Sequence, residues 1–123
     1  MSIHINTIKA TGMELTPAIE EHVRSRVASL EKYVDEKDTS TNMDIEVGKT
    51  TEHHQSGEIF RAEFTIQFKG KTIRATSTNE DLYAAIDEVQ SEASRMMSEH
   101  KSKKKTMFLK GAAQLKDMLK GGQ

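Results

Sequence analysis

The side chains of this sequence that are best suited to binding a ligand are cations, and they gather toward one end of the chain. Lys101, Lys103, Lys104 and Lys105 fall within five positions. Residues 100–123 carry seven Lys and Arg against one Asp, a balance of +6, whereas residues 1–99 carry 11 against 18 Asp and Glu, a balance of −7. A block of ammonium groups suits the phosphates of a nucleic acid. It is equally typical of a solvated tail, so both interpretations are open at this point.

The sequence shows no pattern that predicts catalysis or a resident metal. It has no glycine-rich phosphate loop, no nucleophile elbow and no pair of histidines spaced as on a zinc-binding helix. His53 and His54 are adjacent in a segment expected to be a loop, where histidines are usually solvated. The absence of cysteine excludes disulfides and thiolate ligands. We therefore expect no catalytic residue, no metal site, no cofactor and no small-molecule substrate.

Length and composition predict one small domain in a soluble compartment. A chain of 123 residues with 35% hydrophobic residues and no Trp favours a thin two-layer α+β domain. The first residues lack the basic start and apolar run of a signal peptide, and no segment approaches the ~20 apolar residues of a membrane span. We expect a cytoplasmic protein that makes no membrane contact and is a monomer when free.

The four clustered lysines form the last turn of the longest helix that the sequence predicts, at residues 80–105. Its apolar residues recur every three or four positions and form one stripe on a helical period. The stripe consists of Leu82, Ile86, Val89, Ala93, Met96 and His100. Asn79 is placed to cap the start of this helix. Arg95 has two alternatives, an ion pair within the helix to Glu92 and Glu99 or a contact with a ligand.

An earlier helix is predicted to begin at Pro17, with Thr16 as its cap, and to run to about Val34. Its buried stripe is Ile19, Val23, Val27, Leu30 and Val34. Its basic residues are Arg24, Arg26 and Lys32, which on their own are ordinary surface residues.

Four segments alternate apolar and polar residues, as strands with one buried face do. They lie at residues 3–6, 43–47, 60–68 and 72–77. Lys69, Gly70 and Lys71 form the turn between the last two, with glycine supplying a positive φ. The predicted order is therefore β-α-β-β-β-α, a four-stranded sheet with both helices packed on one face and the other face left open to solvent.

The helix, three antiparallel strands and final helix are also typical of a double-stranded RNA-binding domain. Such domains carry lysines near the start of their final helix. Glu80 and Asp81 occupy that start here, which argues against this assignment.

Three segments carry a more specific resemblance: ELTPAIEEHVRSRVASLEKY at residues 14–33, NEDLYAAIDEV at residues 79–89 and RMMSEHKSK at residues 95–103. They are similar to the ribosome hibernation promoting factor family, which includes the ribosome-associated inhibitor often labelled sigma-54 modulation protein. The resemblance covers residues 1 to about 105. It implies a β-α-β-β-β-α domain that binds the small ribosomal subunit in the channel of messenger and transfer RNA. Such a factor inhibits translation in starved or stationary-phase cells and catalyses no reaction.

The same resemblance implies which residues contact ribosomal RNA. The family's basic helix positions fall here on Arg26, Lys32, Arg95, His100, Lys101 and Lys103, with Arg24, Lys104 and Lys105 as further candidates. Relatives commonly have lysine where this sequence has Glu92 and Glu99.

Long members of the family add a dimerising domain after a linker. The 18 residues after Lys105 are too few for such a domain, so the sequence resembles a short form. We expect a ribosome-binding domain at residues 1–105 and a flexible basic tail at residues 106–123. Two other functions stay open at this point. One is an RNA-binding regulator that acts away from the ribosome, and the other is a scaffold that docks a protein partner on the open face of the sheet.

Overall fold

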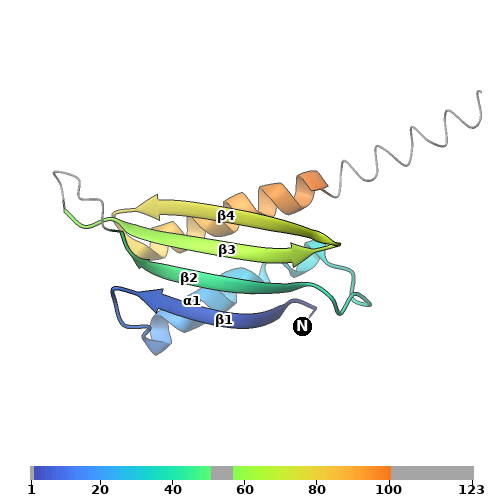
Figure 1. Ribbon diagram of the computed structural model, residues 1–123, viewed down its shortest axis with the longest axis horizontal. Coiled ribbons are helices and arrows are strands. Elements are labelled where there is room, and N and C mark those ends of the chain that lie inside the picture. The colour runs from blue at the N-terminus through green and yellow to red at the C-terminus, as the bar shows by residue number, and fades with distance from the viewer. Residues whose placement is uncertain (1, 51–56, 101–123) are drawn as a thin grey trace, which may run out of the picture.

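The computed structural model describes residues 2–50 and 57–100 of the chain (Figure 1). Within these ranges the elements follow the predicted order β-α-β-β-β-α. They are β1 (His4–Thr11), α1 (Pro17–Ala28), the short 3-10 helix η1 (Glu31–Tyr33), β2 (Asn42–Lys49), β3 (Phe60–Phe68) and β4 (Lys71–Asn79). The second helix occupies residues 82–100.

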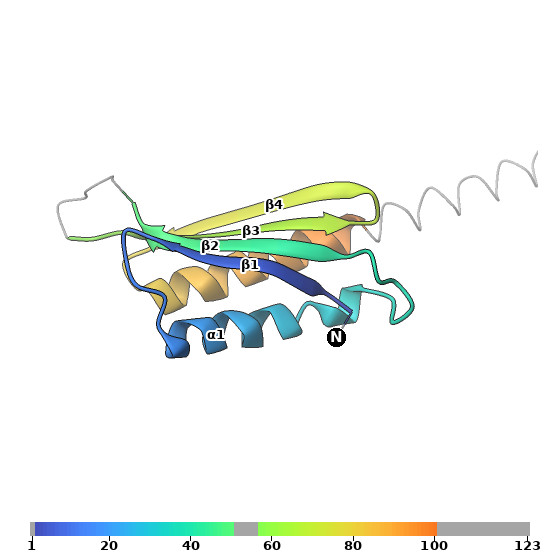
Figure 2. The same ribbon diagram turned by 60° about the horizontal axis from the view of Figure 1, so that its bottom comes forward.

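The four strands form one sheet in the order β1-β2-β3-β4. β1 and β2 are parallel and are joined by the crossover through α1, whereas β2, β3 and β4 are antiparallel. Figure 2 shows that α1 and the second helix lie side by side on the same face of the sheet, as predicted. The core lies between the two layers. Its largest fully buried side chains include Phe64, Phe68, Leu30, Met43, Ile45, Ile66, Ile86 and Met97.

β1 is longer than the sequence predicts because a bulge at Asn6 changes which residues face the core. Ile5 pairs with Met43 and Thr7 with Asp44, so Asn6 has no partner in the register. The side chain of Asn6 donates a hydrogen bond to the side-chain oxygen of Asn42 at 2.8 Å. Beyond the bulge, Ile8 and Ala10 pack against the core. The alternation that ends at Ile5 in the sequence therefore continues with its phase shifted.

The first helix is shorter than predicted, although its predicted stripe is correct. α1 ends at Ala28, and the tighter turn η1 follows it. The break places the carboxylate of Glu31 where it accepts hydrogen bonds from the backbone N–H groups of Ser2 and Ile3, at 2.9 and 3.1 Å. The end of α1 therefore depends on a contact between residues far apart in the sequence, and the spacing of apolar residues within the helix cannot predict such a contact. The five buried stripe residues are Ile19, Val23, Val27, Leu30 and Val34.

The second helix begins at residue 82 rather than 80, and it differs from the prediction in one residue of its buried stripe and in its capping residue. Met97 is fully buried and Met96 is only half-buried, because a stripe of 3.6-residue period passes between the two positions. The cap is Asp81, whose carboxylate accepts a hydrogen bond from the backbone N–H of Tyr83 at 3.0 Å. Asn79 accepts instead from the N–H of Asp81, at 2.9 Å, and so shapes the turn before the helix.

The turn between β3 and β4 has two residues. Lys69 and Gly70 both have positive φ, 51° and 77°, as a type I′ hairpin turn requires. Lys71 is already the first residue of β4, where it pairs with Phe68. The turn therefore presents Lys69 at its tip and Lys71 next to it, both exposed to solvent.

Candidate nucleic-acid interface

α1 and the second helix are joined by a polar cluster around Asp87. Nε of Arg26 donates to Oδ1 of Asp87 at 2.6 Å, and Nε2 of His22 lies 2.8 Å from the same oxygen. The ring of Tyr83 packs edge-on against His22, with the centroids 5.0 Å apart. Burial acts to raise the pKa of Asp87, but hydrogen bonds from Arg26 and His22 outweigh it and hold this pKa below its usual value. Arg26, a predicted RNA contact, is therefore already neutralised by the neighbouring helix.

Arg95 and Arg24 form ion pairs within their own helices. Nη1 of Arg95 donates to Oε1 of Glu99 at 2.7 Å, and its Nη2 pairs with Glu92. The hydrogen bond from Arg95 lowers the pKa of Glu92, and the two carboxylates raise the pKa of Arg95. Nη2 of Arg24 lies 3.1 Å from Oε1 of Glu20, one turn earlier in α1. The ion-pair alternative for Arg95 is thus the one present in the structure, and its contact with RNA stays a prediction.

Lys32 and His100 contact aromatic rings, whereas these arginines contact carboxylates. Lys32 is exposed, and its Nζ lies 5.3 Å from the ring centroid of Tyr33. His100 is half-buried, and its ring meets that of Phe68 with the centroids 5.5 Å apart. The remaining predicted RNA contacts lie outside the described residues. They are Lys101, Lys103, Lys104 and Lys105.

The open face of the sheet balances its own charges. Glu63, whose side chain is 16% exposed, forms ion pairs with Nη2 of Arg61 at 2.9 Å and with Nε of Arg74 at 3.3 Å. The pairing registers surround these charges with small hydroxyl side chains. These are Thr7, Thr11, Thr65, Thr72, Thr76 and Thr78. Because Asp44 and Glu46 lie on the same face, where they accept hydrogen bonds from Thr7 and Thr11, this face presents a mixed polar surface rather than a cationic one.

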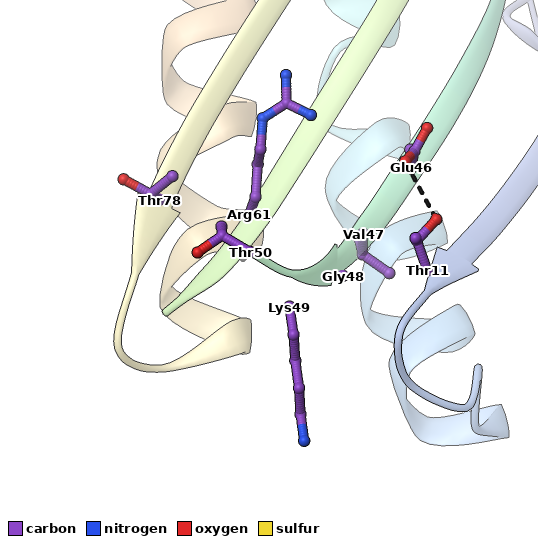
Figure 3. Close-up of a pocket in the computed structure, with 8 residues that line it drawn as sticks. All are labelled: Thr11, Glu46, Val47, Gly48, Lys49, Thr50, Arg61 and Thr78. Atoms are coloured by element: carbon purple, nitrogen blue, oxygen red, sulfur yellow. Dashed lines mark hydrogen bonds between the residues drawn. The ribbon is translucent and has the colours of Figure 1, made fainter. Parts of the chain in front are cut away.

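A hollow lies where β1, β2, β3 and β4 approach one another at one end of the sheet (Figure 3). Its lining is Thr11, Glu46, Val47, Gly48, Lys49, Thr50, Arg61 and Thr78. Nζ of Lys49 points away from the strands in Figure 3 and lies 3.1 Å from Oε1 of Glu58. A Cβ on Gly48 would lie 2.4 Å from the carbonyl oxygen of Thr11, so only glycine permits the close approach of β1 here. Since both cations of the hollow are paired with carboxylates, we assign it no ligand.

Within residues 2–50 and 57–100, no three His, Cys, Asp or Glu side chains are grouped so that they could hold a metal ion. In the same two ranges, no helix is long and apolar enough to cross a membrane. His53 and His54 lie outside the described residues.

The Asp87 cluster was not predicted from the sequence, although the spacing of two of its residues indicates that they lie together. His22 and Arg26 are four positions apart, so they share one flank of α1. Asp87 directly follows Ile86, a buried stripe residue. The helical period predicts on which side of its own helix each residue lies, but it does not predict which sides of the two helices face each other.

Two solved structures share this fold. The N-terminal domain of Protein Y from Thermus thermophilus matches with a TM-score of 0.67 at 23% sequence identity and covers 79% of this chain and 98% of that one. A ribosomal subunit interface protein from Coxiella burnetii matches with a TM-score of 0.63 at 18% identity, over 80% of this chain and 98% of that one.

The sequence is also similar to curated proteins. It is 32% identical over 98 residues to the ribosome hibernation promoting factor of Escherichia coli strain K12, covering 80% of this chain and 94% of that protein. It is 30% identical over 101 residues to the ribosome hibernation promotion factor of Bacillus subtilis strain 168, covering 82% of this chain but only 50% of that protein. A family profile described as Sigma 54 modulation protein / S30EA ribosomal protein matches residues 7–105. The chain therefore belongs to the Sigma 54 modulation protein / S30EA ribosomal protein family.

Proposed function

We propose that this chain is a ribosome hibernation factor. It binds the small ribosomal subunit in the channel of messenger and transfer RNA and inhibits translation during starvation or stationary phase. The observation that carries this proposal is the family match over residues 7–105, together with relatives named ribosome hibernation promoting factor that align over 94% of their length. The factor acts by occupying a site and catalyses no reaction, so its place of action is the cytoplasm, where ribosomes translate.

The surface of the described residues supports a polar partner rather than an apolar one. Tyr83 is the only large hydrophobic side chain exposed in residues 2–50 and 57–100, at 40%. Stable protein partners usually bury an apolar patch of several hundred Å² or more, and one ring does not supply it. Binding to RNA instead draws on phosphate contacts from lysine and arginine, which need no apolar surface.

We infer that the predicted RNA contacts contribute unequally. Arg24, Arg26 and Arg95 each hold a carboxylate at 3.1 Å or less, and a phosphate must compete with that carboxylate. Lys32 has no carboxylate within 4.0 Å among the described residues, so it binds a phosphate without first giving up an ion pair. We place the strongest contacts on Lys32 and on the four lysines after His100, which are Lys101, Lys103, Lys104 and Lys105.

Co-sedimentation of the full chain with purified small subunits tests the proposal. We expect the chain to bind the subunit, and messenger RNA with transfer RNA to displace it. We also expect an in vitro translation reaction to slow when the chain is added before messenger RNA. A chain that binds free RNA but not small subunits would favour a regulator acting away from the ribosome. Binding that messenger and transfer RNA leave unchanged would contradict the proposed channel site.

A further inference from the structure

The arginines and lysines of this protein differ in whether they are already paired. All five arginines hold a carboxylate, each with a nitrogen-to-oxygen distance of 3.3 Å or less. Among the six described lysines, only Lys49 has a carboxylate within 4.0 Å in the part of the chain that the structure describes. The other five are Lys9, Lys32, Lys37, Lys69 and Lys71. The cations that are available to a new anion are therefore lysines.

Four of these five lysines lie at one end of the molecule. Lys32 is in η1, Lys37 follows η1, and Lys69 and Lys71 belong to the turn between β3 and β4. Figures 1 and 2 agree that η1, this turn and the last described residues of the second helix share that end. The two lysines of the turn, Lys69 and Lys71, are called here the hairpin lysines.

A chain of contacts connects the hairpin lysines to the end of the second helix. Nζ of Lys69 lies 5.2 Å from the ring centroid of Phe68, which is fully buried. The ring of His100 also packs against that of Phe68, with the centroids 5.5 Å apart. His100 is the last described residue of the second helix, and Lys101 follows it directly in the sequence. Phe68 thus holds the hairpin turn against the point from which the clustered lysines begin.

The charge of Lys69 affects the pKa of Asp38, but Asp38 does not form an ion pair with Lys69. Hydrogen bonds from the side chain and backbone of Ser40 hold the pKa of Asp38 below its usual value, and the charge of Lys69 adds to this effect. The N–H of Ser40 donates to Asp38 at 2.8 Å, so this carboxylate is turned into its own loop. No oxygen of Asp38 lies within the 4.0 Å of Lys69 that would make an ion pair.

We propose that the hairpin lysines and the last described residues of the second helix form one surface that binds the phosphodiester backbone of RNA. The inference rests on the proposed function and names part of the surface that meets the ribosomal subunit. Ammonium groups are compact point charges without the directional fork of arginine, and no aromatic ring is exposed at this turn in the described residues. The surface therefore recognises phosphate positions rather than base identity.

The test measures affinity for purified small subunits as a function of salt, for the full chain and for Lys69→Gln/Lys71→Gln. Each phosphate contact contributes roughly 0.7–0.9 to the slope of log affinity against log salt. We expect the slope of the double variant to fall by about 1.4–1.8, and Lys69→Arg/Lys71→Arg to restore it. The matched control is Lys9→Gln/Lys49→Gln, which removes two lysines away from this end and should leave the slope unchanged. Thermal melting of each variant checks that the hairpin still folds.

The outcomes separate the two proposals. If the parent chain binds the subunit and the glutamine variant keeps the parental slope, the hairpin surface is wrong and the proposed function stands. A reduced slope that the arginine variant does not restore would also overturn the surface, because charge would not be the cause. If the parent chain does not bind the small subunit, both the proposed function and the proposed RNA-binding surface are wrong.

Discussion

The helix layer and the hairpin end of this protein both carry cations, but only the cations of the hairpin end are not already paired with carboxylates. On the helices, Arg26 is held by Asp87 at 2.6 Å, and Arg95 by Glu99 at 2.7 Å. At the hairpin end, Lys69 and Lys71 have no carboxylate within 4.0 Å among the described residues. The number of basic residues on an element is therefore a poor measure of its capacity to bind phosphate, because pairing decides how many of them are available.

The difference follows from local geometry. On a helix, residues three and four positions apart are neighbours, so Glu92 and Glu99 reach Arg95 from both sides. The turn between β3 and β4 has no such acidic neighbours, since the residue pairs next to it are Phe68 with Lys71 and Gln67 with Thr72. The acidic side chains of this protein therefore neutralise Arg24, Arg26 and Arg95 on the helices but not the hairpin lysines.

The largest effect is expected from the four lysines after His100. Changing Lys101, Lys103, Lys104 and Lys105 to Gln keeps good helix formers while removing four positive charges. We expect the salt slope of small-subunit binding to fall by about 0.7–0.9 for each phosphate that these side chains bind, up to about 3.6 in total. Equilibrium sedimentation over a range of salt concentrations measures this. If the variant binds as tightly as the parent while its circular dichroism is unchanged, these lysines are a solvated tail.

A smaller effect, in the opposite direction, is a gain of binding on the helix layer. Glu92→Gln with Glu99→Gln releases Arg95 from both of its carboxylates. We expect tighter binding to the small subunit and a slope steeper by about 0.7, the value of one new phosphate contact. Glu14→Gln with Glu21→Gln removes the same charge from exposed carboxylates that form no ion pair with a described cation. Equal gains in the two variants would mean that net charge, rather than the release of Arg95, controls affinity.

A smaller effect is expected at Asp87, and it depends on pH. Asp87→Asn removes an ion pair between partly exposed side chains and should lower the free energy of unfolding at neutral pH by less than about 1 kcal/mol. Because the folded pKa of Asp87 lies below its unfolded value near 3.9, this stabilisation is present above about pH 4 and is lost as the pH falls through the folded pKa. Thermal melting of parent and variant from pH 7 to pH 2.5 should show the difference disappearing in acid. A difference that persists undiminished at pH 2.5 would mean that packing, not charge, stabilises the cluster.

The smallest effect is expected at Arg24. This side chain is 54% exposed, and its pair with Glu20 is worth only about 0.3–0.5 kcal/mol. Arg24→Gln should change the melting temperature by no more than about 2 °C and subunit affinity by less than about twofold. Differential scanning fluorimetry and the sedimentation assay measure both. A tenfold loss of affinity would show that RNA displaces Glu20 and that helix arginines bind phosphate despite their pairing.

The fold was predictable from the sequence because its signals are local and repeated. The alternation from Phe60 to Phe68 and the stripe from Ile19 to Val34 each repeat an apolar position several times, and the structure buries those faces as predicted. The predicted bounds of β1 and α1 are wrong because contacts between residues far apart in the sequence determine where these elements end. Asn6 interrupts the alternation of β1, and Glu31 ends α1 to bind a segment almost thirty residues away.

The candidate site was less predictable, for a related reason. The ion pair of Arg95 was one of two alternatives in the sequence, since its partners are three and four positions away. The pair between Arg26 and Asp87 joins residues 61 positions apart, which no local pattern reports. The sequence places the hairpin lysines in a turn and does not say what lies beside it. The contacts of Phe68 with Lys69 and His100 show that the hairpin turn and the end of the second helix share one end of the molecule.

The most direct test of this account compares two variants that remove the same charge from the two regions. Arg24→Gln/Arg95→Gln removes two paired cations of the helices, and Lys69→Gln/Lys71→Gln removes the two hairpin lysines. The account predicts that the slope of log small-subunit affinity against log salt falls by about 1.4–1.8 for the lysine variant. For the arginine variant the slope should stay within the error of the parent. A slope that falls for the arginine variant and not for the lysine variant would contradict the claim that pairing decides which cations bind RNA.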